Sequence, residues 1–133
     1  MCHAQDEDSR DCHSGIYVRL TGGTAGDQVR LVLEGNVSNA RIDVQRWNST
    51  TSYNNYNLQW NDVNGYQWTY LALVVDYGSS IKPYLSKDGV SWVHLNTTIT
   101  GFALNSVNGG IHIKENKTGM DAASTCDWLV YGT

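Results

Sequence analysis

The chain has 133 residues, of which 41% are hydrophobic and 17% are charged, and its formal net charge is −4. This composition fits a single globular domain over residues 1–133 and excludes an intrinsically disordered chain, which is poorer in hydrophobic residues. The acidic charge balance, without a cluster of Lys and Arg, argues against nucleic acid as a partner. No apolar run approaches the roughly 20 residues of a membrane-spanning helix, so no membrane partner is expected.

Apolar and polar residues alternate along most of the chain, and this period of two is typical of half-buried β-strands. Residues 68–76 are apolar at nearly every position, which is the pattern of a strand covered on both faces. In chain order, the patterns predict strands over residues 15–21, 28–34, 40–47, 56–60, 68–76, 81–85, 92–95, 99–104, 110–114 and 125–131, with a weaker candidate over 1–5. No segment has the period of a helix, so we expect an all-β fold, an antiparallel β-sandwich.

Residues 84–92 carry the clearest turn signal of the chain. Asp88 and Gly89 lie between two strand candidates, and an Asp-Gly pair favours a tight hairpin turn with Gly at positive φ. Trp92 follows the turn and is expected to fold back as an apolar anchor. Trp68 and Trp128 lie in strand candidates and are interpreted as core residues as well.

Pro83 is the only proline of the chain. Proline has no N–H to donate to a ladder of hydrogen bonds, so it is found where a strand begins, where it bulges, or where it lies at the edge of a sheet. The sequence alone does not decide which of these three applies to Pro83 in the strand predicted over residues 81–85.

Residues 48–67 are rich in Asn and Tyr and are expected to form a long connection, a kind of segment that often carries function. Alternation over residues 40–47 puts Trp47 on a polar face, where an indole could stack on a sugar while charged and amide groups bind its hydroxyls. The alternative is that Trp47 turns inward at a bulge or lies under the loop. The candidate carbohydrate-binding residues are Arg41, Asp43, Trp47, Tyr53, Tyr56 and Trp60.

Several stretches resemble concanavalin A-like lectin/glucanase domains. They are Leu-Glu-Gly-Asn at 33–36, Arg-Ile-Asp-Val-Gln-Arg-Trp-Asn at 41–48, Trp-Thr-Tyr-Leu at 68–71, Tyr-Leu-Ser-Lys-Asp-Gly-Val-Ser-Trp-Val at 84–93 and Thr-Cys-Asp-Trp-Leu-Val at 125–130. Within that family, the chain looks most like the domains of structural and fibre proteins of tailed bacteriophages. The resemblance implies a jelly-roll β-sandwich.

The resemblance also implies a function and a location. It points to a non-enzymatic module of a bacteriophage virion, such as a capsid decoration, head-fibre or tail-fibre domain, that contacts other virion proteins and binds host-surface glycan weakly through many copies. By analogy with the family, such a module would form a homo-oligomer, a trimer. Two alternatives are a carbohydrate-binding module of a secreted glycoside hydrolase and a structural spacer without ligand, because this fold serves all three roles.

The acidic residues do not form the pattern of a glycoside hydrolase. That chemistry needs two carboxylates on either side of the scissile bond. The three Glu of the chain are Glu7, Glu34 and Glu115, and only Glu7 has other carboxylates nearby in sequence, at Asp6 and Asp8. We therefore expect no enzymatic activity and no catalytic residue.

The N-terminal segment holds the candidate metal ligands that the sequence suggests. Cys2 and Cys12 are each followed by a His, and thiolate and imidazole bind zinc. Neighbouring residues of a strand point to opposite faces, which favours ordinary hairpin residues over a zinc site. The acidic run from Asp6 to Asp11 offers oxygen ligands for calcium, although a solvated turn is favoured. We expect no metal and no cofactor, and a Cys2–Cys12 disulfide is left open.

Overall fold

The computed structural model describes residues 12–20, 28–35, 40–48, 53–61, 70–76, 80–100 and 107–115. Within these ranges all regular secondary structure is β-strand, and no helix is found there. The strands are β1 (Cys12–Leu20), β2 (Gln28–Gly35), β3 (Ala40–Trp47), β4 (Tyr53–Asn61), β5 (Tyr70–Asp76), β6 (Ser80–Ser86), β7 (Val93–His94), β8 (Ile99–Thr100) and β9 (Val107–Glu115). The strands predicted over residues 1–5 and 125–131, together with Trp68, Trp128 and Cys126, lie outside the described residues.

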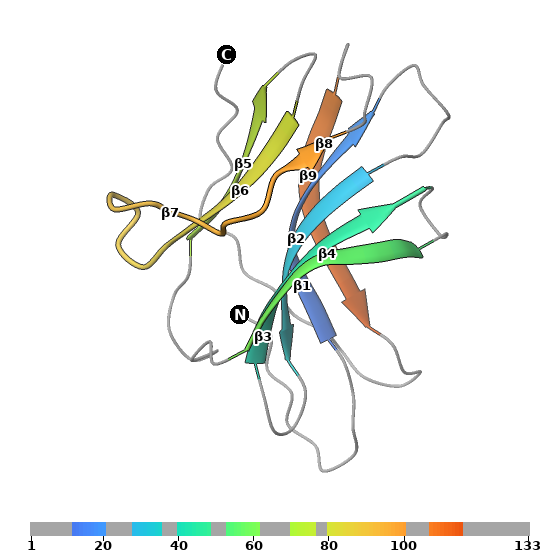
Figure 1. Ribbon diagram of the computed structural model, residues 1–133. Coiled ribbons are helices and arrows are strands. Elements are labelled where there is room, and N and C mark those ends of the chain that lie inside the picture. The colour runs from blue at the N-terminus through green and yellow to red at the C-terminus, as the bar shows by residue number, and fades with distance from the viewer. Residues whose placement is uncertain are drawn as a thin grey trace.

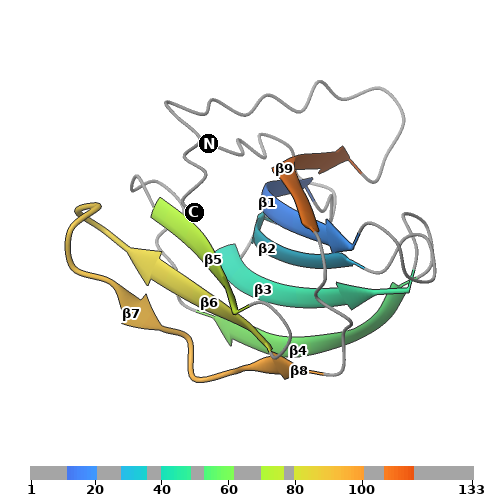
Figure 2. The ribbon, with the colours of Figure 1, turned by 90° about the horizontal axis from the view of Figure 1, so that it is seen from above.

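The strands form two antiparallel sheets. One sheet has the order β4-β3-β2-β1-β9, and the other has the order β5-β6-β7, with β8 also paired to β6. Figure 1 shows the two groups of strands, and Figure 2 shows them from above. β5 approaches β1 and β2 of the first sheet. The antiparallel all-β prediction is therefore confirmed for the described part of the chain.

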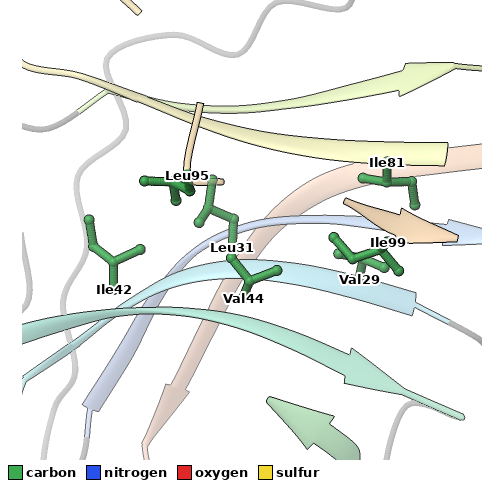
Figure 3. Close-up of a cluster of buried hydrophobic side chains, with 7 residues drawn as sticks. All are labelled: Val29, Leu31, Ile42, Val44, Ile81, Leu95 and Ile99. Carbon is green, nitrogen blue, oxygen red and sulfur yellow. The ribbon is translucent and has the colours of Figure 1, made fainter. Parts of the chain in front are cut away.

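One apolar cluster joins the two sheets. Successive side chains of a strand point to opposite faces, so Val29 and Leu31 of β2 share one face with Ile42 and Val44 of β3. The register pairs Leu31 with Val44 directly across the two strands. Burying each large side chain stabilises the fold by about 1.5–3 kcal/mol. The cluster, drawn in Figure 3, consists of Val29, Leu31, Ile42, Val44, Ile81, Leu95 and Ile99.

Pro83 lies inside β6 and its side chain is buried. The ladder between β5 and β6 runs through Pro83 without a register shift. Of the three positions predicted for this proline, the start of a strand and a bulge are therefore both wrong. On its other side, β6 pairs with β8 before Pro83 and with β7 after it, and the Pro83 carbonyl accepts a hydrogen bond of 3.1 Å from the Leu95 N–H. The N–H and C=O of a residue in an antiparallel strand point to the same side. The N–H that Pro83 lacks would therefore point into the gap between β7 and β8. At this one position β6 has no paired strand on that side, so Pro83 behaves like a residue at the edge of a sheet.

The connection between β6 and β7 is wider than the tight turn predicted from Asp88 and Gly89, because β6 ends at Ser86 and β7 begins at Val93. Gly89 does adopt the predicted positive φ, at 75°. Trp92 precedes the first residue pair between β6 and β7, so it lies in the connection and is 39% exposed. The predicted core position of Trp92 is therefore wrong.

Side-chain oxygens hold this wider connection together. Oδ1 of Asp88 accepts hydrogen bonds from the backbone N–H of Val90 at 2.8 Å and of Ser91 at 2.7 Å, and from the Ser86 hydroxyl at 2.9 Å. Ser86 Oγ in turn accepts the backbone N–H of Gly89 at 2.9 Å. These bonds satisfy backbone donors that have no strand partner, as Asp and Ser side chains commonly do in turns.

Substituting Gly89 with alanine is expected to destabilise the protein by about 1–2 kcal/mol, the penalty for a Cβ in the left-handed region. A Cβ at this position would also lie 3.3 Å from the ring of Tyr70, which leaves the new methyl group little room. Thermal denaturation of G89A against the wild type measures the effect. G89N is the matched control and should lose less, because Asn tolerates positive φ. A G89A protein at least as stable as the wild type would contradict the conformation given for this loop.

The loop is expected to keep its structure in mild acid. Hydrogen bonds from the backbone N–H groups of Ser91 and Val90, and then from the Ser86 hydroxyl, hold the pKa of the Asp88 carboxyl well below its usual range. A lowered pKa means that the stabilisation is complete above the ordinary Asp value of about 3.9 and is lost only as the pH falls through the lower folded value. In an NMR titration, the amide signals of Val90 and Ser91 should therefore stay constant down to about pH 3. Movement of these wild-type signals centred near the ordinary Asp value, and absent in D88N, would refute this.

Candidate functional site

The polar face predicted around Trp47 exists on β2 and β3. Cα partners across these strands are Gln28 with Trp47, Arg30 with Gln45, and Val32 with Asp43. Directly opposite residues of an antiparallel pair share a face. Trp47 therefore lies on the face of Arg41, Asp43 and Gln45, opposite to the face of the apolar cluster, as alternation predicted.

Trp47 is held by two polar neighbours. The guanidinium carbon of Arg30 lies 3.8 Å from the centroid of the indole, which is a cation–π contact. The indole Nε1–H donates a hydrogen bond of 3.0 Å to Oε1 of Gln45. Burial lowers the pKa of Arg30, but a guanidinium starts so high that it stays charged at neutral pH. The side chains of Arg30, Gln45 and Trp47 thus form one connected group.

A second contact on this face joins Arg41 to Asp43, with 3.3 Å between Arg41 Nε and Asp43 Oδ1. The Arg41 side chain is 29% exposed, whereas Asp43 is fully buried. The geometry of this contact is that of an ion pair rather than of an aligned hydrogen bond. An acidic group buried in this way needs a neighbouring cation to stay ionised, and Arg41 supplies one.

The face is closed rather than open. Trp47 is 8% exposed, Arg30 5% and Gln45 1%. Of the two alternatives that the sequence left for Trp47, the structure shows the packed one, although no bulge of β3 turns the residue inward. In this conformation the indole offers little surface for stacking on a sugar. We name the five residues that make up this group the polar layer: Arg30, Arg41, Asp43, Gln45 and Trp47.

The three candidate residues on β4 divide between the two faces by register. Tyr53 is the Cα partner of Trp47, and Tyr56 is the partner of Gln45, so both occupy positions on the face of the polar layer. Trp60 is the partner of Ile42, a core residue, and therefore occupies a position on the opposite face. The β3–β4 register shifts between Val44 and Gln45 and between Arg46 and Trp47, which places the extra residues on β4. The register thus brings together Trp47, Tyr53 and Tyr56 but not Trp60.

Among the described residues, three large apolar side chains are exposed in another part of the molecule. Val90 is 81% exposed, Val93 56% and Trp92 39%, all within the connection from β6 to β7 and the start of β7. We name residues 87–93 the hairpin tip. The sequence did not predict this surface, because an apolar residue just after an Asp-Gly turn is normally assigned to the second strand of a hairpin and hence to the core. The signal that could have found it is Ser86, whose hydroxyl lies at the right spacing to hold a wider turn.

The described residues contain neither a candidate metal cluster nor a helix that could span a membrane. No group of three or more His, Cys, Asp or Glu side chains that could hold a metal ion is found among the described residues. The candidate ligands Cys2, His3 and Asp6 to Asp11 lie outside those residues, and so does any Cys2–Cys12 disulfide. Over the described ranges, no helix has the length and apolar character to cross a bilayer.

Comparisons of the chain with protein-family models, with curated proteins and with solved structures found no match in any of the three.

Proposed function

We propose that this chain is a concanavalin A-like, jelly-roll β-sandwich that serves as a non-enzymatic structural and adhesion module of a bacteriophage virion. In this role it is a capsid decoration, head-fibre or tail-fibre domain in a homo-oligomer, and it binds host-surface glycan weakly through many copies. Weak single sites suffice for such a module because repetition on one particle raises the overall avidity.

The observation that carries the glycan part of the proposal is the register of β3 and β4. It gathers three aromatic residues, Trp47, Tyr53 and Tyr56, on one face of a strand pair that shifts register twice. β4 ends the strand order of the described five-stranded sheet, and irregular pairing at a sheet edge often re-aims side chains at a binding site. Tyr is suited to such a site because its ring stacks and its hydroxyl hydrogen-bonds.

The structural part of the proposal rests on the two sheets and their common apolar cluster. A core built from residues of both sheets, such as Leu31 and Ile81, makes a rigid frame that can be repeated over a particle surface. Short connections such as the hairpin tip then remain accessible at the rim.

One observation favours the second candidate function, a spacer without ligand. Trp47 is 8% exposed and Asp43 is fully buried, so two of the candidate binding residues are occupied in holding the sheet together. A spacer needs only the rigid frame. The two functions differ in whether Tyr53 and Tyr56 contact a ligand.

The test has two arms. Immunogold labelling of purified phage particles with an antibody against this chain should decorate the virion, and absence of label from every particle that encodes the chain would refute the virion role. A glycan array should then give hits with a wild-type multimer that Y53A/Y56A loses, while the exposed V74S on β5 is the matched control and keeps them. Labelled virions without any glycan hit would instead establish the spacer.

A further inference from the structure

The hairpin tip contains a sequence in which an Asp residue readily isomerises. Asp88 is exposed to solvent and is followed by Gly89. In such a pair the backbone nitrogen of the Gly can form a bond to Cγ of the Asp side chain, because no Cβ on the Gly shields that nitrogen. The carboxyl OH leaves as water with the amide proton, and a cyclic imide forms. Another water molecule opens the ring, and opening at the former backbone carbonyl gives isoaspartate, with the main chain running through Cγ and the mass of the chain unchanged.

The structure of the loop depends on both residues of this pair. Gly89 has a φ of 75°, and a Cβ at this position would lie 3.3 Å from the ring of Tyr70, so a larger residue is disfavoured. Oδ1 of Asp88 accepts the backbone N–H groups of Val90 and Ser91. Replacing either Asp88 or Gly89 by a less reactive residue would therefore cost the loop its conformation or its hydrogen bonds.

The side chain of Ser86 contacts both groups that would react. Its Oγ accepts the backbone N–H of Gly89 at 2.9 Å, and its hydroxyl donates to Oδ1 of Asp88, also at 2.9 Å. The attacking nitrogen must give up its proton, and here that N–H is already held by Ser86. The carboxyl must rotate onto the nitrogen, and here the Ser86 hydroxyl and two backbone donors fix its orientation. Cyclisation therefore requires these hydrogen bonds to break first.

The charge of Asp88 acts in the same direction. A carboxylate is a poor electrophile, because an oxygen leaves as water only from the protonated group. Hydrogen bonds from the backbone N–H groups of Ser91 and Val90, and then from the Ser86 hydroxyl, hold the pKa of the Asp88 carboxyl well below its usual range. The protonated form that could cyclise is therefore scarce at neutral pH.

We propose that Asp88-Gly89 is a latent isomerisation site, which the side chain of Ser86 keeps in the aspartyl form while the loop is folded. An isoaspartate at residue 88 lengthens the main chain by a carbon atom and moves the carboxylate away from the N–H groups that it accepts. The loop would then lose the hydrogen bonds that satisfy its backbone. The site lies between β6 and β7, so the proposal holds whether or not β3 and β4 bind glycan.

Incubation of the full chain for several weeks at physiological temperature and neutral pH tests the proposal, with peptide mapping that separates the Asp88 peptide from its isoaspartyl form. The folded wild type should isomerise at residue 88 more slowly than the same chain unfolded in guanidinium chloride, by about tenfold or more. Folded S86A should isomerise about tenfold faster than the folded wild type, the factor expected when a hydrogen bond to a charged group is lost.

Two control variants separate Ser86 from a general loss of stability. I42V removes a methyl group from the apolar cluster, and V90S changes an exposed side chain of the same loop, so both should keep the wild-type rate. If S86A does not fold, hydrogen exchange of the wild-type Gly89 amide decides, and it should be slowed by about tenfold or more. An unprotected Gly89 amide, a folded wild type that isomerises as fast as the unfolded chain, or a folded S86A no faster than I42V and V90S would overturn the proposal.

Discussion

Replacing Trp47 with alanine is expected to lower the free energy of unfolding by about 3–5 kcal/mol, the usual loss for truncating a buried Trp. The indole is 8% exposed, so its removal leaves a cavity in the polar layer. It also leaves the Arg30 guanidinium without its aromatic partner and Gln45 Oε1 without the indole donor. Urea denaturation followed by circular dichroism, compared between W47A and the wild type, measures the loss.

The conservative variant separates packing from hydrogen bonding. W47F keeps an aromatic ring beneath Arg30 but removes the 3.0 Å hydrogen bond to Gln45, so it should lose only about 1–2 kcal/mol. If W47A instead costs less than about 1 kcal/mol, the indole does not pack as the structure shows. Trp47 would then regain the role of an open sugar platform that its place on a polar face first suggested.

Period-two alternation was sufficient to locate most of the strands that the structure describes. It placed β3 over residues 40–47 as observed, and it assigned Ile42 and Val44 to the same face, where both are buried in the core. The prediction succeeded because a strand has only two faces, so one apolar face fixes the position of every other residue. β4 was harder, since it begins at Tyr53 within a polar, Asn-rich stretch whose two register shifts interrupt the alternation.

What the sequence could not give was the degree of burial. Alternation correctly placed Asp43 and Gln45 on a polar face, but whether such a face is open or covered depends on segments distant in sequence. The same limit explains Trp92, where the width of the turn rather than its composition decides exposure. It also explains Pro83, since the gap between β7 and β8 that accommodates it is set by the path of two separate strands.

Burial of most of the polar layer changes which of its residues can bind a ligand. A buried ion pair contributes little net stability, because removing two charges from water offsets most of their attraction. Its groups nevertheless constrain the fold, since neither partner can lose the other without leaving a charge in a poorly solvated place. Arg41 and Asp43 were expected to bind sugar hydroxyls. In the structure they contact each other, so their first role is to stabilise the sheet.

Replacing Asp43 with asparagine is therefore expected to destabilise the protein by about 3 kcal/mol, the lower end of the range for breaking a buried pair. The lower end applies because Arg41, 29% exposed, keeps some contact with water after it loses the carboxylate. Asn has nearly the same shape as Asp, so the loss reports the charge rather than a cavity. The comparison is made by urea denaturation at neutral pH.

A double-mutant cycle shows whether Arg41 is the group that stabilises this carboxylate. R41Q combined with D43N should lose less stability than the sum of the two single substitutions, because the second change removes a charge that the first has already isolated. R46Q is the matched control, because Arg46 lies on the same strand but on its opposite face. The stability losses of R46Q and D43N should therefore add without coupling. Strict additivity for R41Q and D43N would show that the 3.3 Å contact carries no coupling, and Asp43 would then have to be stabilised by groups other than Arg41.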